Sequence, residues 1–190
     1  MTIQIKVKDL FGKNVSGIKL ETYEHACISF LNQWGITNGI NIELHLDFLY
    51  KDFNNSNSVL YKEEQLKQAT GSTFFISQNR FKVFLNRKHI VKLAKESLDS
   101  KLNKDDLIMY FIITSLAHEL VHVKQHFYKE LKYVHNKVFF NNLDITNVDY
   151  EANPCEEEAF YYAELMRKSY YKEKVIMYDF FINDYSFKGE

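Results

Sequence analysis

The sequence predicts an α+β fold, in which a small mixed or antiparallel sheet packs on one buried helix with a second helix beside it. Short segments of the first half alternate apolar and polar residues, which is the period of a half-buried strand. The segment from Asn103 to about Leu131 is apolar on almost every side between Leu107 and Val121, as expected of a helix inside a core. The segment from Pro154 to about Tyr171 begins with a cap, a proline and acidic residues, and it therefore predicts the second helix.

Length and composition predict a single domain. The chain has 190 residues, of which 46% are hydrophobic and 16% aromatic, enough for one sizeable core and few for two. Within this domain (1–190) we expect residues 1–86 to be mainly sheet-forming with one helix, and residues 87–172 to form the helical part. The aromatic tail, residues 173–190, is expected to cover the domain.

Charge and cysteine content exclude some partners and favour a compartment. The net charge is −1 with acids and bases interspersed, so we expect no nucleic-acid and no membrane partner. The first residues alternate rather than form a secretory apolar run, and the run from Leu107 to Ala117 is too short to span a bilayer. Cys27 and Cys155 are too few for a disulfide framework, so we expect free thiols and a cytoplasmic protein.

The remaining elements follow from periodicity and turn residues. A helix at 22–34 is predicted to start at Thr22 as cap and to end at Gly35. The other predicted elements are a strand at 3–8, a turn at 12–17, a strand at 40–46, a loop at 54–58, a short helix at 61–69, a hairpin of strands 72–78 and 81–86, a helix at 87–99, a hairpin at 137–144 that turns on Asn141-Asn142, and a loop at 145–152.

The buried helix carries the motif His118-Glu119-Leu120-Val121-His122, an HExxH sequence. Residues four apart lie on one face of a helix, so both imidazoles can reach one metal ion. Glu119 lies about 60° around the helix from His122, which suits a base that holds a metal-bound water. The alternative is a pair of hydrogen-bonded core histidines, but burying these polar groups uncompensated among Leu, Ile and Phe would cost several kcal/mol.

A catalytic zinc needs a third protein ligand. Gln125 and Tyr128 stand where a metzincin would have glycine and histidine, which excludes that class. His126 rises about 12 Å along the axis from His118, too far for both to hold one ion, and is expected to support the site or lie at the surface.

The acidic start of the second helix offers better candidates for the third ligand. Glu156 lies on the stripe shared with Ala159, Phe160 and Ala163, which is expected to face the core, and it is our candidate for the third ligand. Glu158 is the rival third ligand, because a small error in the helix phase would exchange the two. An ordinary acidic helix N-terminus would also account for the run of acids.

The two motifs together, Ala-His-Glu-Leu-Val-His-Val-Lys-Gln at 117–125 and Tyr-x-x-Asn-Pro-Cys-Glu-Glu-Glu-Ala-Phe at 150–160, resemble the gluzincins, zinc metallopeptidases of the zincin superfamily. The resemblance is to small bacterial and phage versions and covers roughly residues 80–165. It implies a zincin-like fold, one Zn²⁺ per chain bound by His118, His122 and Glu156, Glu119 as catalytic base, and a protein or peptide substrate. It also implies that strand 81–86 is the sheet edge that pairs with an extended substrate. Cys155 departs from the pattern, which often has a large aromatic there, and we expect a small buried hydrophobe.

The leading hypothesis is therefore a zinc metallopeptidase. Tyr150, Tyr133 and His135 are candidate oxyanion donors, because they lie in the segment expected to close over the site. One alternative is a non-catalytic protein that keeps zinc as a structural staple, against which Glu119 argues, since a closed structural site has no use for a base. Another is a zinc hydrolase that acts on a non-peptide substrate.

Overall fold

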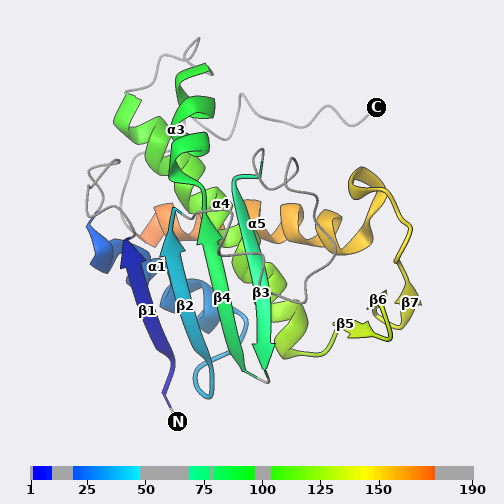
Figure 1. Cartoon of the computed structure of the whole chain (residues 1–190). Helices are drawn as coiled ribbons and strands as arrows, with labels where there is room; N and C mark the ends of the chain where they lie inside the picture. Colours follow the sequence, from blue (N-terminus) through cyan, green and yellow to red (C-terminus); the bar gives the residue numbers. More distant parts are fainter. Residues whose placement is uncertain (1, 10–18, 48–68, 78, 97–103, 174–190) are drawn as a thin grey trace.

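A computed structural model of the chain describes residues 2–9, 19–47, 69–77, 79–96 and 104–173. These residues form a mixed sheet, a set of helices on one of its faces and a small second sheet (Figure 1). The predicted α+β class is confirmed at this level. The predictions for 12–17, 54–58, 61–69, the cap at Asn103 and the cover at 173–190 lie outside the described residues or at their borders.

The main sheet has the strand order β1-β2-β4-β3, with β1 (Gln4–Asp9), β2 (Asn41–Leu46) and β4 (Arg80–Leu85) parallel and β3 (Gly71–Ser77) antiparallel to β4. Alternation explains how the sheet packs, because every second residue of β2 and β4 points to the helices. These residues are all buried: Ile42, Leu44, Leu46, Phe81, Val83 and Leu85. The hairpin predicted from strands 72–78 and 81–86 is present, with Asn79 at a φ of 65° in its turn.

The edge strand differs from the prediction. Residues 81–86 were expected at the sheet edge, but β4 lies between β2 and β3, and β3 forms that edge (Figure 1). The uninterrupted burial of one face of β4, together with the buried Phe84 on its other face, is typical of an interior strand. Near its end β3 exposes Phe75 and Ile76, which is consistent with its position at the edge.

Helix α1 (Leu20–Gln33) starts two residues earlier than predicted. Thr22 is not its cap: the backbone N–H of Thr22 already bonds the carbonyl of Lys19 at 3.0 Å, and Lys19 makes no side-chain capping bond. The end is as predicted, because Gly35 follows at a φ of 73°, a conformation that favours glycine. Its apolar stripe, Tyr23, Ala26, Cys27, Phe30 and Leu31, is buried.

Helix α3 (Arg87–Glu96) follows β4 directly and begins with a buried ion cluster. Arg87 is 1% exposed and donates to Asp9 at the end of β1 and to Asp47 just after β2, at 2.8 Å in each case. The three charged groups thus connect the ends of three parallel strands.

Helix α4 (Lys104–Phe127) is the buried helix predicted from the sequence. It lies behind β4 and β3 in Figure 1 and contacts α1, α3 and α5. The apolar run Leu107–Ala117 was predicted to be too short to span a bilayer. The longer window Leu107–Phe127 could cross one by length and composition, but 67% of this window is buried inside the domain. The helix ends four residues before Leu131, because Lys129 takes a φ of 60° and the N–H of Glu130 closes back on the carbonyl of Gln125 at 2.8 Å.

The chain then forms the second sheet, with the order β5 (Leu131–Val134), β6 (Lys137–Phe140), β7 (Leu143–Asp144). Both turns have two successive residues with positive φ, His135-Asn136 at 48° and 62° and Asn141-Asn142 at 48° and 68°. The second turn is as predicted. The first was missed, since His135 is not a typical turn residue and no element was predicted between about Leu131, the expected end of the helix, and Lys137.

The 3-10 helix η2 (Tyr150–Ala152) interrupts the predicted loop and leads into α5 (Pro154–Glu173), which begins at Pro154 as predicted. The Asn153 side chain accepts a hydrogen bond from the N–H of Cys155 at 3.1 Å, the bond of an N-cap. Ala159, Ala163 and Met166 are buried, whereas Phe160, expected on the same core face, is 51% exposed.

Candidate metal centre

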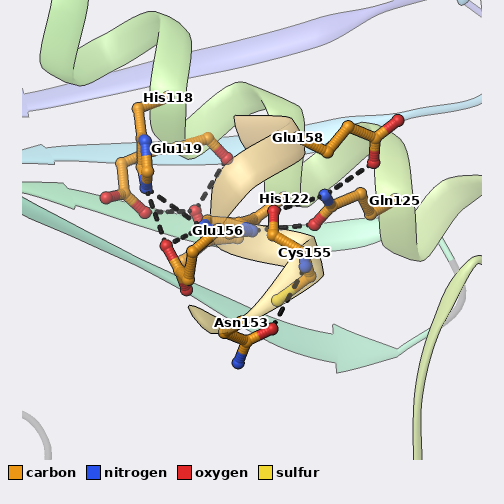
Figure 2. Close-up of polar contacts among 9 residues, drawn as sticks. His118, Glu119, His122, Gln125, Asn153, Cys155, Glu156 and Glu158 are labelled. Carbon is orange, nitrogen blue, oxygen red and sulfur yellow. Dashed lines mark hydrogen bonds and ion pairs between the residues drawn. The ribbon is translucent and has the colours of Figure 1, made fainter. Parts of the chain in front are cut away.

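Three side chains from α4 and α5 converge at one point: His118, His122 and Glu156 (Figure 2). The Nε2 atoms of the histidines are 3.2 Å apart, and Oε2 of Glu156 lies 3.2 Å from the Nε2 atom of His118 and 3.4 Å from that of His122. Neighbouring ligands of a tetrahedral zinc with bonds of about 2.0–2.1 Å lie about 3.3 Å apart. The three donor atoms therefore already have the mutual spacing of a tetrahedral metal site.

The charges at this point are also those of a cation site. Burial alone would raise the pKa of Glu156, but hydrogen bonds from His118 and His122 hold it well below its usual range. Burial alone would lower the pKa of His122, yet the hydrogen bond and charge of Glu156 outweigh it and raise the pKa to about 9. Glu156 thus favours the protonated, positively charged form of His122 between α4 and α5. A divalent metal bound to these residues would take the place of the proton on His122.

Glu119 lies beside these ligands but is not one of them. Glu119 is 5% exposed, and residues of the edge strand β3 contact its side chain. The Thr73 hydroxyl lies 2.8 Å from the Glu119 carboxylate and 2.9 Å from the Glu119 carbonyl. A Cβ atom added at Gly71 would stand 2.6 Å from Cγ of Glu119, so the absence of a side chain at Gly71 gives the carboxylate its space. Burial raises the pKa of Glu119, although His118, His122 and Thr73 oppose the shift.

The rival ligand Glu158 faces away from the imidazoles. One carboxylate oxygen accepts a hydrogen bond from Lys124 at 2.8 Å, and the other accepts one from Gln125 at 2.8 Å. Glu156, and not Glu158, is thus the carboxylate that lies beside His118 and His122, as the helix phase predicted.

Aromatic residues stand around the ligands. The ring of Phe160 lies 4.6 Å from that of His118, and the ring of Tyr150 lies 6.4 Å from that of Phe160. Partial burial and the carboxylates of Glu156 and Glu119 raise the pKa of Tyr150, which also hydrogen-bonds Glu156. Tyr150 is therefore a protonated donor at the ligands.

The other predicted candidates have their described contacts outside the ligand group. His126 stacks between Phe75 and Tyr133, with ring centroids 5.3 Å and 5.4 Å away, and it does not belong to the group of possible ligands. Tyr133 thus uses its ring to pack on His126, and His135 lies in the exposed turn between β5 and β6. Among the three predicted oxyanion donors, a hydrogen bond to the ligand Glu156 is found for Tyr150.

Cys155 is 4% exposed, packs with Leu131, Val138, Phe140 and Ile145, and has a pKa raised to about 12 by burial. It is a free, uncharged thiol, as is the buried Cys27. The expectation of a small buried hydrophobe at this position is confirmed.

Three residues near the centre were missed as site residues: Gly71, Thr73 and Gln125. Gly71 and Thr73 are 48 and 46 positions before Glu119, and nothing local in the sequence relates them to it. The position of Gln125 near the ligands could have been predicted, because Gln125 follows His122 by three residues and therefore lies on the same helix face.

No protein-family model matches the chain, and the comparison with curated proteins finds no match either. The class that fold and geometry define is a mixed α+β domain with a preformed group of three donors, two imidazoles and a carboxylate, that could hold a metal ion. A more specific function is a matter for proposal.

Proposed function

We propose that this protein is a zinc-dependent metallopeptidase with a zincin-like fold, whose single zinc is bound by His118, His122 and Glu156. The observation that carries the proposal is the spacing of the three donor atoms, 3.2, 3.2 and 3.4 Å, in a site enclosed by α4 and α5. Two imidazoles and one carboxylate, with room for a water, are a donor set of catalytic zinc sites. A zinc ion there would polarise the attacking water and the substrate carbonyl.

The chain's own residues then carry the proton. Glu119 accepts a proton from the attacking water and returns it to the nitrogen of the leaving amine, so the base is regenerated and one peptide bond is cleaved. The hydrogen bond from Thr73 orients the Glu119 carboxylate, and the missing side chain of Gly71 leaves room for it beside the ligand group. Tyr150 donates a hydrogen bond to the oxyanion that develops on the substrate.

The buried, oriented Glu119 favours this reading over a structural zinc staple. A staple needs ligands only, whereas here a carboxylate that is no ligand is enclosed beside them, at a desolvation cost. A substrate of protein or peptide nature follows from the resemblance of the two motifs, and the edge strand available to it is β3 rather than the predicted β4. The buried free thiols Cys27 and Cys155 fit a reducing compartment, and we place the reaction in the cytoplasm.

The test combines metal analysis with peptide hydrolysis. The purified protein is expected to hold one zinc per chain, and a chelator is expected to lower its melting temperature, because the metal joins α4 to α5. Glu119→Gln should keep the zinc and lose about 10²-fold or more of the activity on a quenched-fluorescent peptide library.

Protein that neither carries zinc nor rebinds it refutes the proposal, and so does a Glu119→Gln variant as fast as the parent. Stoichiometric zinc without cleavage of any peptide or unfolded protein would instead favour the staple or a non-peptide substrate.

A further inference from the structure

Gln125 is completely buried at the C-terminal end of α4 and makes three hydrogen bonds (Figure 2). Its Oε1 atom lies 2.8 Å from Nδ1 of His122, and its Nε2 atom donates to the carbonyl of Cys155 at 2.9 Å and to Glu158 at 2.8 Å. One amide thus connects a metal ligand on α4 with the first turn of α5.

The orientation of this amide follows from its partners. The carbonyl of Cys155 and the carboxylate of Glu158 can only accept hydrogen bonds, so both must face the NH₂ group of Gln125. Lys124 donates a hydrogen bond to the other carboxylate oxygen of Glu158 at 2.8 Å and one to Glu130 at 2.8 Å, which fixes the position of the Glu158 carboxylate.

The fixed amide in turn fixes His122. With the NH₂ group committed, Oε1 is the atom that faces His122, and it can only accept, so Nδ1 of His122 must carry a hydrogen. The lone pair available for a metal is then on Nε2, the atom 3.2 Å from Nε2 of His118. No such partner is present for Nδ1 of His118, which is buried and makes no hydrogen bond within the described part of the chain.

We propose that Gln125 is a positioning residue for the metal, held by Glu158 and Lys124, which presents Nε2 of His122 to the ion. This inference rests on the metal-binding part of the proposed function and not on peptide hydrolysis. It also gives Glu158 a role, as the group that orients the amide instead of binding the metal.

The experiment measures zinc affinity by competition with a chromophoric chelator, next to the unfolding of the zinc-free protein in urea. Gln125→Met keeps the length of the side chain and removes the acceptor, and it is expected to weaken zinc binding by about 10- to 100-fold. The double variant Gln125→Glu/Glu158→Gln exchanges the two groups, keeps the net charge and restores an acceptor at His122, but it leaves the carbonyl of Cys155 without its donor. Its zinc affinity is therefore expected to lie between that of Gln125→Met and that of the parent. Glu157→Gln, on the exposed side of the same turn of α5, is the matched control and should not change the affinity.

The visible spectrum of the cobalt-loaded proteins adds a readout that a purely structural role would not move. In Gln125→Met the ligand-field bands are expected to shift or broaden, because His122 is free to rotate, and in the exchange variant they should return to the parent's pattern. Should Gln125→Met not fold, the exchange variant and Glu158→Met provide the test, with Glu158→Met expected to bind zinc more weakly than Glu157→Gln.

The inference is overturned if Gln125→Met binds zinc as tightly as the parent, or if its affinity exceeds that of the exchange variant. Absence of zinc binding in the parent overturns it as well, since no metal would then require positioning. Zinc binding with these effects but without peptidase activity would support the inference while refuting the proposed hydrolysis.

Discussion

Replacing Gly71 with alanine tests whether β3 positions the base. The new Cβ would lie 2.6 Å from Cγ, 2.7 Å from Oε1 and 2.9 Å from Cδ of Glu119. These atoms belong to the end of a flexible side chain, so Glu119 is expected to move rather than the backbone. The move is about 0.8 Å, the amount by which 2.6 Å falls short of an ordinary contact of 3.4 Å.

A displacement of this size at a reacting group reduces rates by about 10²-fold, so Gly71→Ala should lose that much of the hydrolysis rate on a quenched-fluorescent peptide substrate. Zinc affinity should be unchanged, because the ligands come from α4 and α5. The urea stability of the zinc-free variant should stay within about 1 kcal/mol of the parent, since Gly71 has no left-handed φ and alanine restricts the unfolded chain.

The control is Ser77→Ala, an exposed position at the end of the same strand, which should leave rate, affinity and stability as they are. The reasoning is refuted if Gly71→Ala hydrolyses the substrate at the parent rate. It is also refuted if the variant loses zinc or unfolds, because the strand would then support the ligands or the fold rather than the base alone.

Further predictions concern single side chains. Thr73→Val removes the hydroxyl from the base at constant shape and should slow hydrolysis by about 10-fold or more, whereas Thr73→Ser should keep most of the rate; equal rates for the two would exclude the hydrogen bond as the cause. Glu156→Gln should weaken zinc binding by more than about 100-fold in the chelator competition, and an affinity close to the parent's would remove Glu156 from the ligand set. Arg87→Met removes the guanidinium that pairs with the buried Asp47 and the partly buried Asp9, and it should lower the free energy of unfolding in urea by about 3–5 kcal/mol. A loss below about 1 kcal/mol would contradict a stabilising role of this ion cluster.

The sequence predicted those elements whose signals are local. Alternation revealed β1, β2 and the β3–β4 hairpin, and Asn153 with Pro154 marked the start of α5, because capping depends on neighbouring residues. The approach of Glu156 to the histidines was predicted because two faces with 3.6-residue periodicity had to meet. The order of the strands was not predicted. Whether a strand lies inside the sheet, like β4, or at its edge, like β3, depends on which distant segments of the chain pair with it.

The candidate site also combines residues that local sequence patterns reveal with residues that only the fold brings together. His118, Glu119 and His122 form one short motif, whereas the contacts of Glu119 with Gly71 and Thr73 bring together residues that periodicity cannot relate. Phe160 was misplaced for a different reason. Its spacing placed Phe160 on the stripe of Ala159 and Ala163, but its side chain is 51% exposed and its ring lies against that of His118, 4.6 Å away, instead of in the core.

The cluster of Arg87, Asp9 and Asp47 has a consequence for the order in which the molecule folds. Arg87 comes 40 positions after Asp47 and 78 after Asp9, so its ion pairs form only when β1, β2 and β4 have already aligned. Closing such long loops is slow, and contacts of this kind stabilise the completed structure more than the transition state. We therefore expect the cluster to slow the separation of the parallel strands during unfolding and to have little influence on the rate at which these strands first pair.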